Sequence, residues 1–204
     1  ILDSGIAAGG IPYLAMELLI GRTLADELRE RSPLPLSRCI QIIVPVCDVL
    51  IEAHAAGIVH RDVKPANVFL CGGAWPSQPK LLDFGIAKPL GERGLTRTGT
   101  IVGTPVYMAP EQIREEPVDA RTDVYGAGAT LYEALTGRPP FVGDGARLMR
   151  DVLVAELPHV TTLRPGLDPG LAAIVHRALA KDPGLRFASA AEMRERLLAF
   201  TEVV

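Results

Sequence analysis

The 204-residue chain is predicted to be an α+β protein, with a β-hairpin at its N-terminus and a mainly helical body after it. Two observations predict this fold class. Residues 1–19 are apolar and β-prone and are broken at Gly9, Gly10 and Pro12, as in two antiparallel strands joined by a turn. From residue 36 onward, apolar residues recur at three- and four-residue steps, which is the spacing of amphipathic helices.

After the hairpin, a short helix is expected over 24–29 and a long helix over 36–56, with Gly57 as its stop signal. The long helix carries a core-facing stripe, made of Ile40, Ile43, Val44, Cys47, Leu50 and Ile51. Two short strands follow at 68–70 and 80–82, separated by a loop that contains Gly and Pro.

Helices dominate from residue 109 onward. One is expected over 122–136 and ends at Gly137, and others begin near residues 147, 169 and 189. In the last helix Ser189 and Glu192 have the spacing of an N-terminal capping box.

Composition excludes several classes of protein. The net charge is −3 and charges of both signs are interleaved, so we expect no nucleic-acid partner. Three cysteines without paired spacing argue against a disulfide framework or zinc site and favour a cytoplasmic location. Polar residues interrupt the most apolar stretch, 40–59, so we expect no membrane segment in this chain. The chain starts at Ile1 with a strand-like pattern, so we expect N-terminal truncation, and a membrane anchor of the full-length protein would lie outside this segment.

The segment H-R-D-V-K-P-A-N at 60–67 carries the clearest chemistry. Asp62 can accept the proton of an attacking hydroxyl, Lys64 can stabilise a transferring phosphoryl group, and Asn67 offers an oxygen to Mg²⁺. Asp83, in D-F-G at 83–85, follows an apolar run and is a second candidate Mg²⁺ ligand on a turn.

With G-T-P-V-Y-M-A-P-E at 103–111, these segments resemble, in order and spacing, the catalytic loop, D-F-G turn and A-P-E end of protein kinases. The resemblance covers essentially the whole chain. It implies a protein-kinase-like fold: residues 1–19 would be a remnant of the small-lobe sheet and the hinge, and 20–204 the helical C-terminal lobe. The presence of Lys64 and Thr104 resembles the serine/threonine-specific members, and the sequence V-K-P-A-N-V at 63–68 resembles that of bacterial eukaryotic-like kinases.

The resemblance also implies roles for single residues. ATP and Mg²⁺, with Mn²⁺ as a substitute, would be the cofactors. Met16 would be the gatekeeper, the backbone of Glu17 and Leu19 would bind adenine, and Phe69 would form the floor beneath it. Asn67 and Asp83 would hold the metal.

Four further residues are given structural roles by the resemblance. Asp123 would hold the catalytic-loop backbone, and Glu111 would pair with Arg186. His60 would be structural and would pack against Phe84.

Regulation and partners follow from the same likeness. Arg61 places a cation where a phosphorylated loop could dock. Thr96 and Thr98 match the T-x-T pattern that bacterial members autophosphorylate. The expected partners are proteins that present Ser or Thr hydroxyls, and a second copy of the kinase during autophosphorylation.

The sequence departs from the family in one respect. The Gly-rich phosphate loop, the strand lysine and the small-lobe glutamate are absent, so we expect the isolated chain to be inactive. A noncatalytic scaffold is the main alternative, against which four intact residues argue: Asp62, Lys64, Asn67 and Asp83. A small-molecule phosphotransferase of the aminoglycoside type is a third reading, which the A-P-E segment, Thr104 and Arg186 disfavour.

Overall fold

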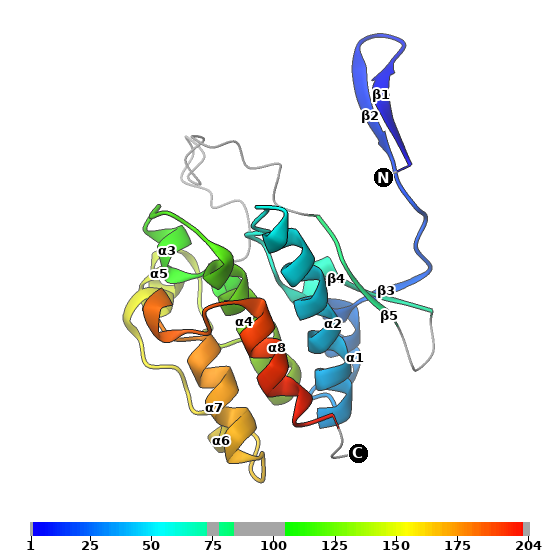
Figure 1. The fold of residues 1–204 in the computed structure, drawn as a ribbon. Coiled ribbons are helices and arrows are strands. Elements are labelled where there is room, and N and C mark those ends of the chain that lie inside the picture. The colour runs from blue at the N-terminus through cyan, green and yellow to red at the C-terminus, as the bar shows by residue number, and fades with distance from the viewer. Residues whose placement is uncertain (1, 73–77, 84–104, 202–204) are drawn as a thin grey trace.

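The computed structural model describes residues 2–72, 78–83 and 105–201, and helix α4 lies at the centre of its helical body (Figure 1). Helix α4 covers Ala120–Thr136. It begins at Asp119, whose side chain accepts a hydrogen bond from the N–H of Arg121, and ends at Gly137 in the left-handed conformation. Every residue from Thr122 to Leu135 except Glu133 is buried, so the helix has no polar face over this stretch.

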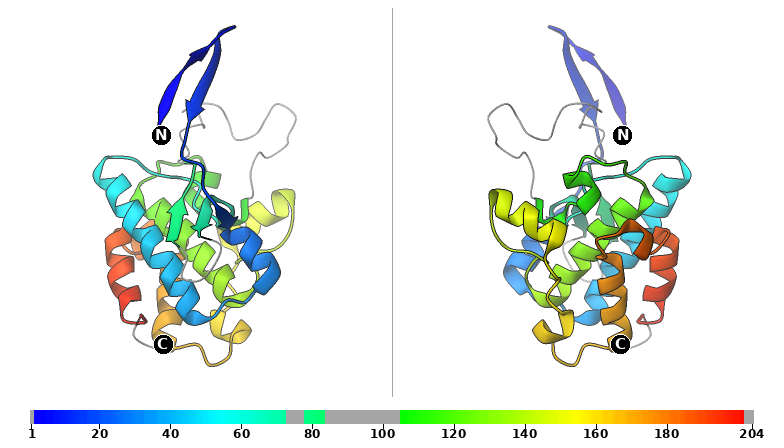
Figure 2. Two further views of the ribbon diagram at one scale, coloured as in Figure 1. Left: turned by 90° about the vertical axis from the view of Figure 1, so that its right-hand side faces the viewer. Right: turned by 90° about the vertical axis from the view of Figure 1, so that its left-hand side faces the viewer.

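The other helices surround α4. It packs against α2, α7 and α8, and α2 also packs against α8 (Figures 1 and 2). The remaining α-helices are α1 (Leu24–Arg31), α2 (Leu36–Ala55), α3 (Pro110–Ile113), α5 (Gly145–Val154), α6 (Val160–Leu163), α7 (Pro169–Ala178) and α8 (Ala190–Leu198), and short 3₁₀ turns cover Pro65–Asn67, Pro105–Tyr107 and Pro183–Leu185.

Strands form two separate antiparallel sheets. Strands β1 (Asp3–Ala7) and β2 (Ile11–Ala15) pair only with each other among the described strands, and this hairpin projects from the helical body (Figures 1 and 2). Strands β3 (Gly21–Thr23), β4 (Val68–Cys71) and β5 (Gln78–Leu81) form the second sheet in the order β3-β4-β5. Strand β4 of this sheet directly follows the loop at residues 60–67, which the chain enters from α2.

The predicted α+β class is confirmed, as are the antiparallel hairpin and the long helices. The core stripe predicted for α2 contains the fully buried Ile40, Ile43, Cys47 and Leu50, and Val44 and Ile51 are partly buried against it.

Three details differ from the prediction. The hairpin strands end at Ala15 rather than near residue 19, and the three-residue strand β3 was not predicted. The capping box of α8 is only half formed, because Glu192 accepts a hydrogen bond from the N–H of Ala188 instead of Ser189.

In the described residues, no helix combines the length and apolarity needed to cross a bilayer.

Candidate active site

The backbone of the catalytic loop is held by one buried carboxylate. Asp123, in the first turn of α4, is 1% exposed and accepts hydrogen bonds from the N–H groups of His60 (2.8 Å) and Arg61 (2.7 Å). His54 of α2 donates to the same carboxylate from Nε2 at 2.8 Å. These three donors satisfy a charge that would otherwise be costly to bury. Asp123 therefore ties α2, α4 and the loop together.

His60 links the catalytic loop to the segment that ends at Asp83. Its Nε2 donates to the carbonyl oxygen of Leu82 (2.9 Å), and its Nδ1 accepts from the N–H of Asp62 (3.2 Å). Burial lowers the pKa of His60. A neutral ring with its proton on Nε2 is the form that makes both hydrogen bonds. The predicted partner Phe84 lies outside the described residues.

Lys64 and Asn67 both contact the same carboxylate oxygen of Asp62, Oδ2. Lys64 Nζ lies 2.8 Å from Asp62 Oδ2, and Asn67 Nδ2 donates to the same oxygen at 3.0 Å. Asn67 Nδ2 also donates to the backbone carbonyl of Asp62 at 2.8 Å, which fixes the orientation of the amide. The side chain of Asp62 is 31% exposed and that of Lys64 is 18% exposed. This carboxylate is therefore held on one side and open to solvent on the other.

Asp83 lies beside this cluster. The N–H of Leu82 donates to the carbonyl oxygen of Asn67 (2.8 Å), and Asp83 follows with a left-handed φ of 52° and an exposed side chain. Since Asn67 Nδ2 is used by Asp62, its Oδ1 is left without a hydrogen bond from the described residues.

The amide oxygen of Asn67 and the carboxylate of Asp83 form a donor set that fits Mg²⁺. The part of the chain that the structure describes has no cluster of three or more His, Cys, Asp or Glu that could hold a metal. One amide oxygen and one carboxylate suit Mg²⁺, because this ion keeps several waters and binds through one or two carboxylates plus substrate phosphates.

Of the predicted adenine-binding residues, Glu17 contacts edge strand β5 of the second sheet and Phe69 lies on its central strand β4. Glu17 forms an ion pair with Lys80 of β5 (2.6 Å), and Ile20 accepts a backbone hydrogen bond from Gly72. Met16 is 60% exposed and Leu19 is half-buried.

Phe69 is half-buried on β4, and its neighbours Val68 and Leu70 are buried in the core. This alternation places Phe69 on the opposite face of β4 from the core.

Arg186 and Glu111 form a buried ion pair that anchors α3. Guanidinium nitrogens donate to both carboxylate oxygens at 2.7 and 2.8 Å, and Thr122 donates to the same carboxylate at 2.8 Å. Burial, the largest single influence, raises the pKa of Glu111, but the hydrogen bonds and charge of Arg186, a backbone N–H and Thr122 together lower it below its ordinary value. The remaining Arg186 donors reach the backbone carbonyls of Ala180, Lys181 and Arg121, so that all five N–H groups are used.

Of the predicted regulatory residues Arg61, Thr96 and Thr98, the described part of the chain includes Arg61. Arg61 is half-buried and has a left-handed φ of 66°. Thr96, Thr98 and Thr104 lie outside the described residues.

Sequence reasoning missed Gln112, whose side chain contacts the backbone of the catalytic loop at Arg61 (2.7 Å). Position 109 is Ala, which lacks the side-chain acceptor of a capping box, so no local pattern drew attention to Gln112. The contact of His54 with Asp123 likewise had no local signal in the sequence.

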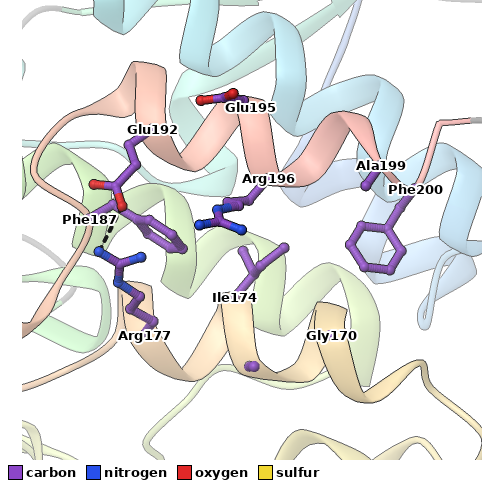
Figure 3. Close-up of a pocket in the computed structure, with 10 residues that line it drawn as sticks. Gly170, Ile174, Arg177, Phe187, Glu192, Glu195, Arg196, Ala199 and Phe200 are labelled. Carbon is purple, nitrogen blue, oxygen red and sulfur yellow. Dashed lines mark ion pairs between the residues drawn. The ribbon is translucent and has the colours of Figure 1, made fainter.

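A groove of about 700 Å³ lies elsewhere, between α7 and α8 (Figure 3). Its apolar lining includes Ile174, Phe187 and Phe200, and the ion pair between Arg177 and Glu192 (2.7 Å) lies at one end. None of the predicted site residues lines it. The groove is therefore separate from the catalytic loop.

The helical body, the loop held by Asp123 and the Asp-Lys-Asn cluster together are the features of a protein-kinase-like fold. The family model described as "Protein kinase domain" matches residues 9–197, and the chain belongs to the protein kinase family.

Two similar proteins come from Mycobacterium tuberculosis and Streptomyces coelicolor. Serine/threonine-protein kinase PknB of Mycobacterium tuberculosis (strain H37Rv) is 42% identical over 204 residues, which is 97% of this chain and 32% of that protein. A probable serine/threonine-protein kinase of Streptomyces coelicolor is 44% identical over 187 residues, covering 90% of this chain and 27% of that protein. The chain spans about a third of the length of the curated relatives it matches.

Solved structures agree with the fold. The kinase domain of PknI from Mycobacterium tuberculosis matches with a TM-score of 0.74 and 30% sequence identity, over 97% of this chain and 69% of that one. The predicted likeness to bacterial eukaryotic-like serine/threonine kinases is thereby confirmed.

Proposed function

We propose that the protein containing this chain is a serine/threonine protein kinase that transfers the γ-phosphoryl group of ATP to Ser and Thr hydroxyls of proteins. The observation that carries the proposal is the convergence of Lys64 and Asn67 on Oδ2 of Asp62. A positioned, partly open carboxylate beside a lysine and an amide is the arrangement that a hydroxyl nucleophile and a phosphate need. The names of the similar proteins support the same acceptor class.

Asp62 would act as the base. Its Oδ2 is held by Lys64 and Asn67, and Oδ1 accepts no hydrogen bond from any described residue, so the proton of the substrate hydroxyl would move to Oδ1. Lys64 would stabilise negative charge on the transferring group.

Nucleotide-bound Mg²⁺, or Mn²⁺ in its place, would supply charge neutralisation at the phosphates when bound. Asn67 and Asp83 would hold the metal. Met16, Glu17, Leu19 and Phe69 would hold the adenine.

The proposal extends to regulation. Phosphates on Thr96 and Thr98, placed there by a second copy of the kinase, would pair with Arg61. Mass spectrometry of the active full-length protein would show both threonines unmodified if this part is wrong.

The three free thiols of the described cysteines, Cys39, Cys47 and Cys71, fit a cytoplasmic kinase lobe.

The test is a peptide-phosphorylation assay with the complete protein. We expect phosphate on Ser or Thr, and a loss of kcat of about 10²–10⁴-fold in the Asp62→Asn variant, because general-base catalysis contributes on that scale. Asp144→Asn is the matched control, since Asp144 is exposed and makes no capping hydrogen bond through its side chain. Full activity of Asp62→Asn, or phosphorylation of small molecules but not of peptides, would contradict the proposal.

The isolated 204 residues would transfer phosphate hardly at all, because they hold neither the Gly-rich loop nor the strand lysine. The same assay on the isolated chain checks this. Robust transfer without the missing parts would show that positioning by the small lobe is dispensable.

A further inference from the structure

The peptide that precedes Asp62 is held in an uncommon conformation. Arg61 has a φ of 66°, in the left-handed region that residues other than glycine seldom adopt. Such a conformation persists only where surrounding contacts determine it. The N–H of Arg61 is held by Asp123 (2.7 Å), and its carbonyl oxygen accepts a hydrogen bond from Nε2 of Gln112 (2.7 Å). Both backbone groups of Arg61 are thus held by side chains from other elements.

The amide of Gln112 is itself fixed. Its Oε1 accepts a hydrogen bond from the N–H of Ala109 (3.0 Å), which directs Nε2 toward the loop. Its chain neighbour Glu111 is anchored to Arg186 on the other side of α3. Helix α3 therefore presents one side chain to the core of the lobe and the next to the catalytic loop.

These contacts determine the direction of the Asp62 side chain. In the peptide group between Arg61 and Asp62, the N–H donates to His60 Nδ1 (3.2 Å) and the carbonyl oxygen accepts from Gln112 Nε2. Holding both ends of a planar peptide fixes its rotation, and this rotation sets where the next Cα–Cβ bond points. A change at Gln112 would consequently be felt at the Asp62 carboxylate.

We propose that Gln112 is a positioning residue for Asp62, which couples the anchored A-P-E segment to the catalytic base. This inference rests on the proposed kinase activity. Gln112 does not touch the carboxylate, so its effect must pass through the Arg61–Asp62 peptide.

Two substitutions in the complete kinase separate this role from simple helix capping. In Gln112→Glu an oxygen can still accept from Ala109, but no N–H remains for the carbonyl of Arg61. Gln112→Met removes both hydrogen bonds without adding a charge. We expect both variants to lose kcat about 10- to 100-fold, since small misplacements of catalytic groups cost on that scale, while KM for ATP and for peptide stays within about twofold.

Gln41→Met is the matched control, because Gln41 is exposed on α2. Melting temperatures report whether each variant is folded at the assay temperature. Wild-type kcat in Gln112→Glu, with loss only in Gln112→Met, would reduce Gln112 to a helix cap and overturn the inference. So would a rise in KM at constant kcat in both variants. An inactive wild-type protein would instead contradict the proposed function itself.

Discussion

Arg186 donates to both carboxylate oxygens of Glu111 across 75 residues of chain, and both side chains are almost completely buried. Breaking a buried pair by removing one partner leaves an uncompensated charge, which costs about 3–5 kcal/mol. Arg186→Met should therefore lower the free energy of unfolding by that amount, measured by urea denaturation. Arg150→Met is the control, because the side chain of Arg150, which pairs with the half-buried Asp151, is 73% exposed, and it should change stability by less than about 0.5 kcal/mol. Equal effects of the two substitutions would contradict the structural role of the buried pair.

Gly126 allows α4 to approach the catalytic loop. A Cβ at this position would lie 2.8 Å from both Cβ and the carbonyl oxygen of Val63, which directly follows Asp62. Gly126→Ala should therefore displace the loop and lower kcat of the complete kinase about tenfold or more.

Gly128→Ala is the matched control, because its Cβ would meet Ala178 of α7 at 2.7 Å and leave the loop untouched. Both variants should lose stability by roughly 1–3 kcal/mol through overpacking, less what alanine gains in a helix. Only Gly126→Ala should lose kcat. Equal kcat in the two variants would argue against contact with the loop as the cause.

His176 should make stability fall as the pH is lowered from 7 to 5. Its Nε2 accepts a hydrogen bond from Val160 N–H, and its ring stacks on His159 at 4.3 Å. Burial first, and His159 second, lower the pKa of His176 below 6.5 in the folded protein. As the pH falls through 6.5, the unfolded chain therefore takes up a proton before the folded chain does, and unfolding is favoured.

Gln in place of His176 keeps an acceptor but does not titrate. Urea denaturation of His176→Gln at pH 7 and pH 5 should show a smaller loss of stability than the wild type. An identical loss in both proteins would place the titrating group elsewhere.

The helices could be predicted because their burial is periodic or continuous along the chain. Helices α2 and α4 carry long apolar stretches, and each is followed within two residues by a glycine with positive φ, Gly57 and Gly137, so their ends could also be predicted. Strand β3 has only three residues, Gly21–Thr23. It forms because it pairs with β4, which follows α2 in the sequence. No local pattern encodes such a partner.

The candidate site was predictable where its residues are neighbours in sequence. Asp62, Lys64 and Asn67 lie within six positions, so that their spacing alone suggested a cluster. Gln112 contacts the loop at Arg61, 51 positions away, and His54 contacts Asp123, 69 positions away, so both act only through tertiary contacts. Those contacts depend on how α2, α3 and α4 pack.

The long separations between the catalytic loop and its clamps also bear on the order in which the chain folds. His60, Arg61 and the carbonyl of Arg61 are bonded to residues 63, 62 and 51 positions away. The entropy of closing such long segments must be overcome before these bonds form. In pulsed hydrogen-exchange refolding, the amides of α2 should therefore become protected before those of His60 and Arg61, so that the loop is assembled late, on a helical body that is already in place.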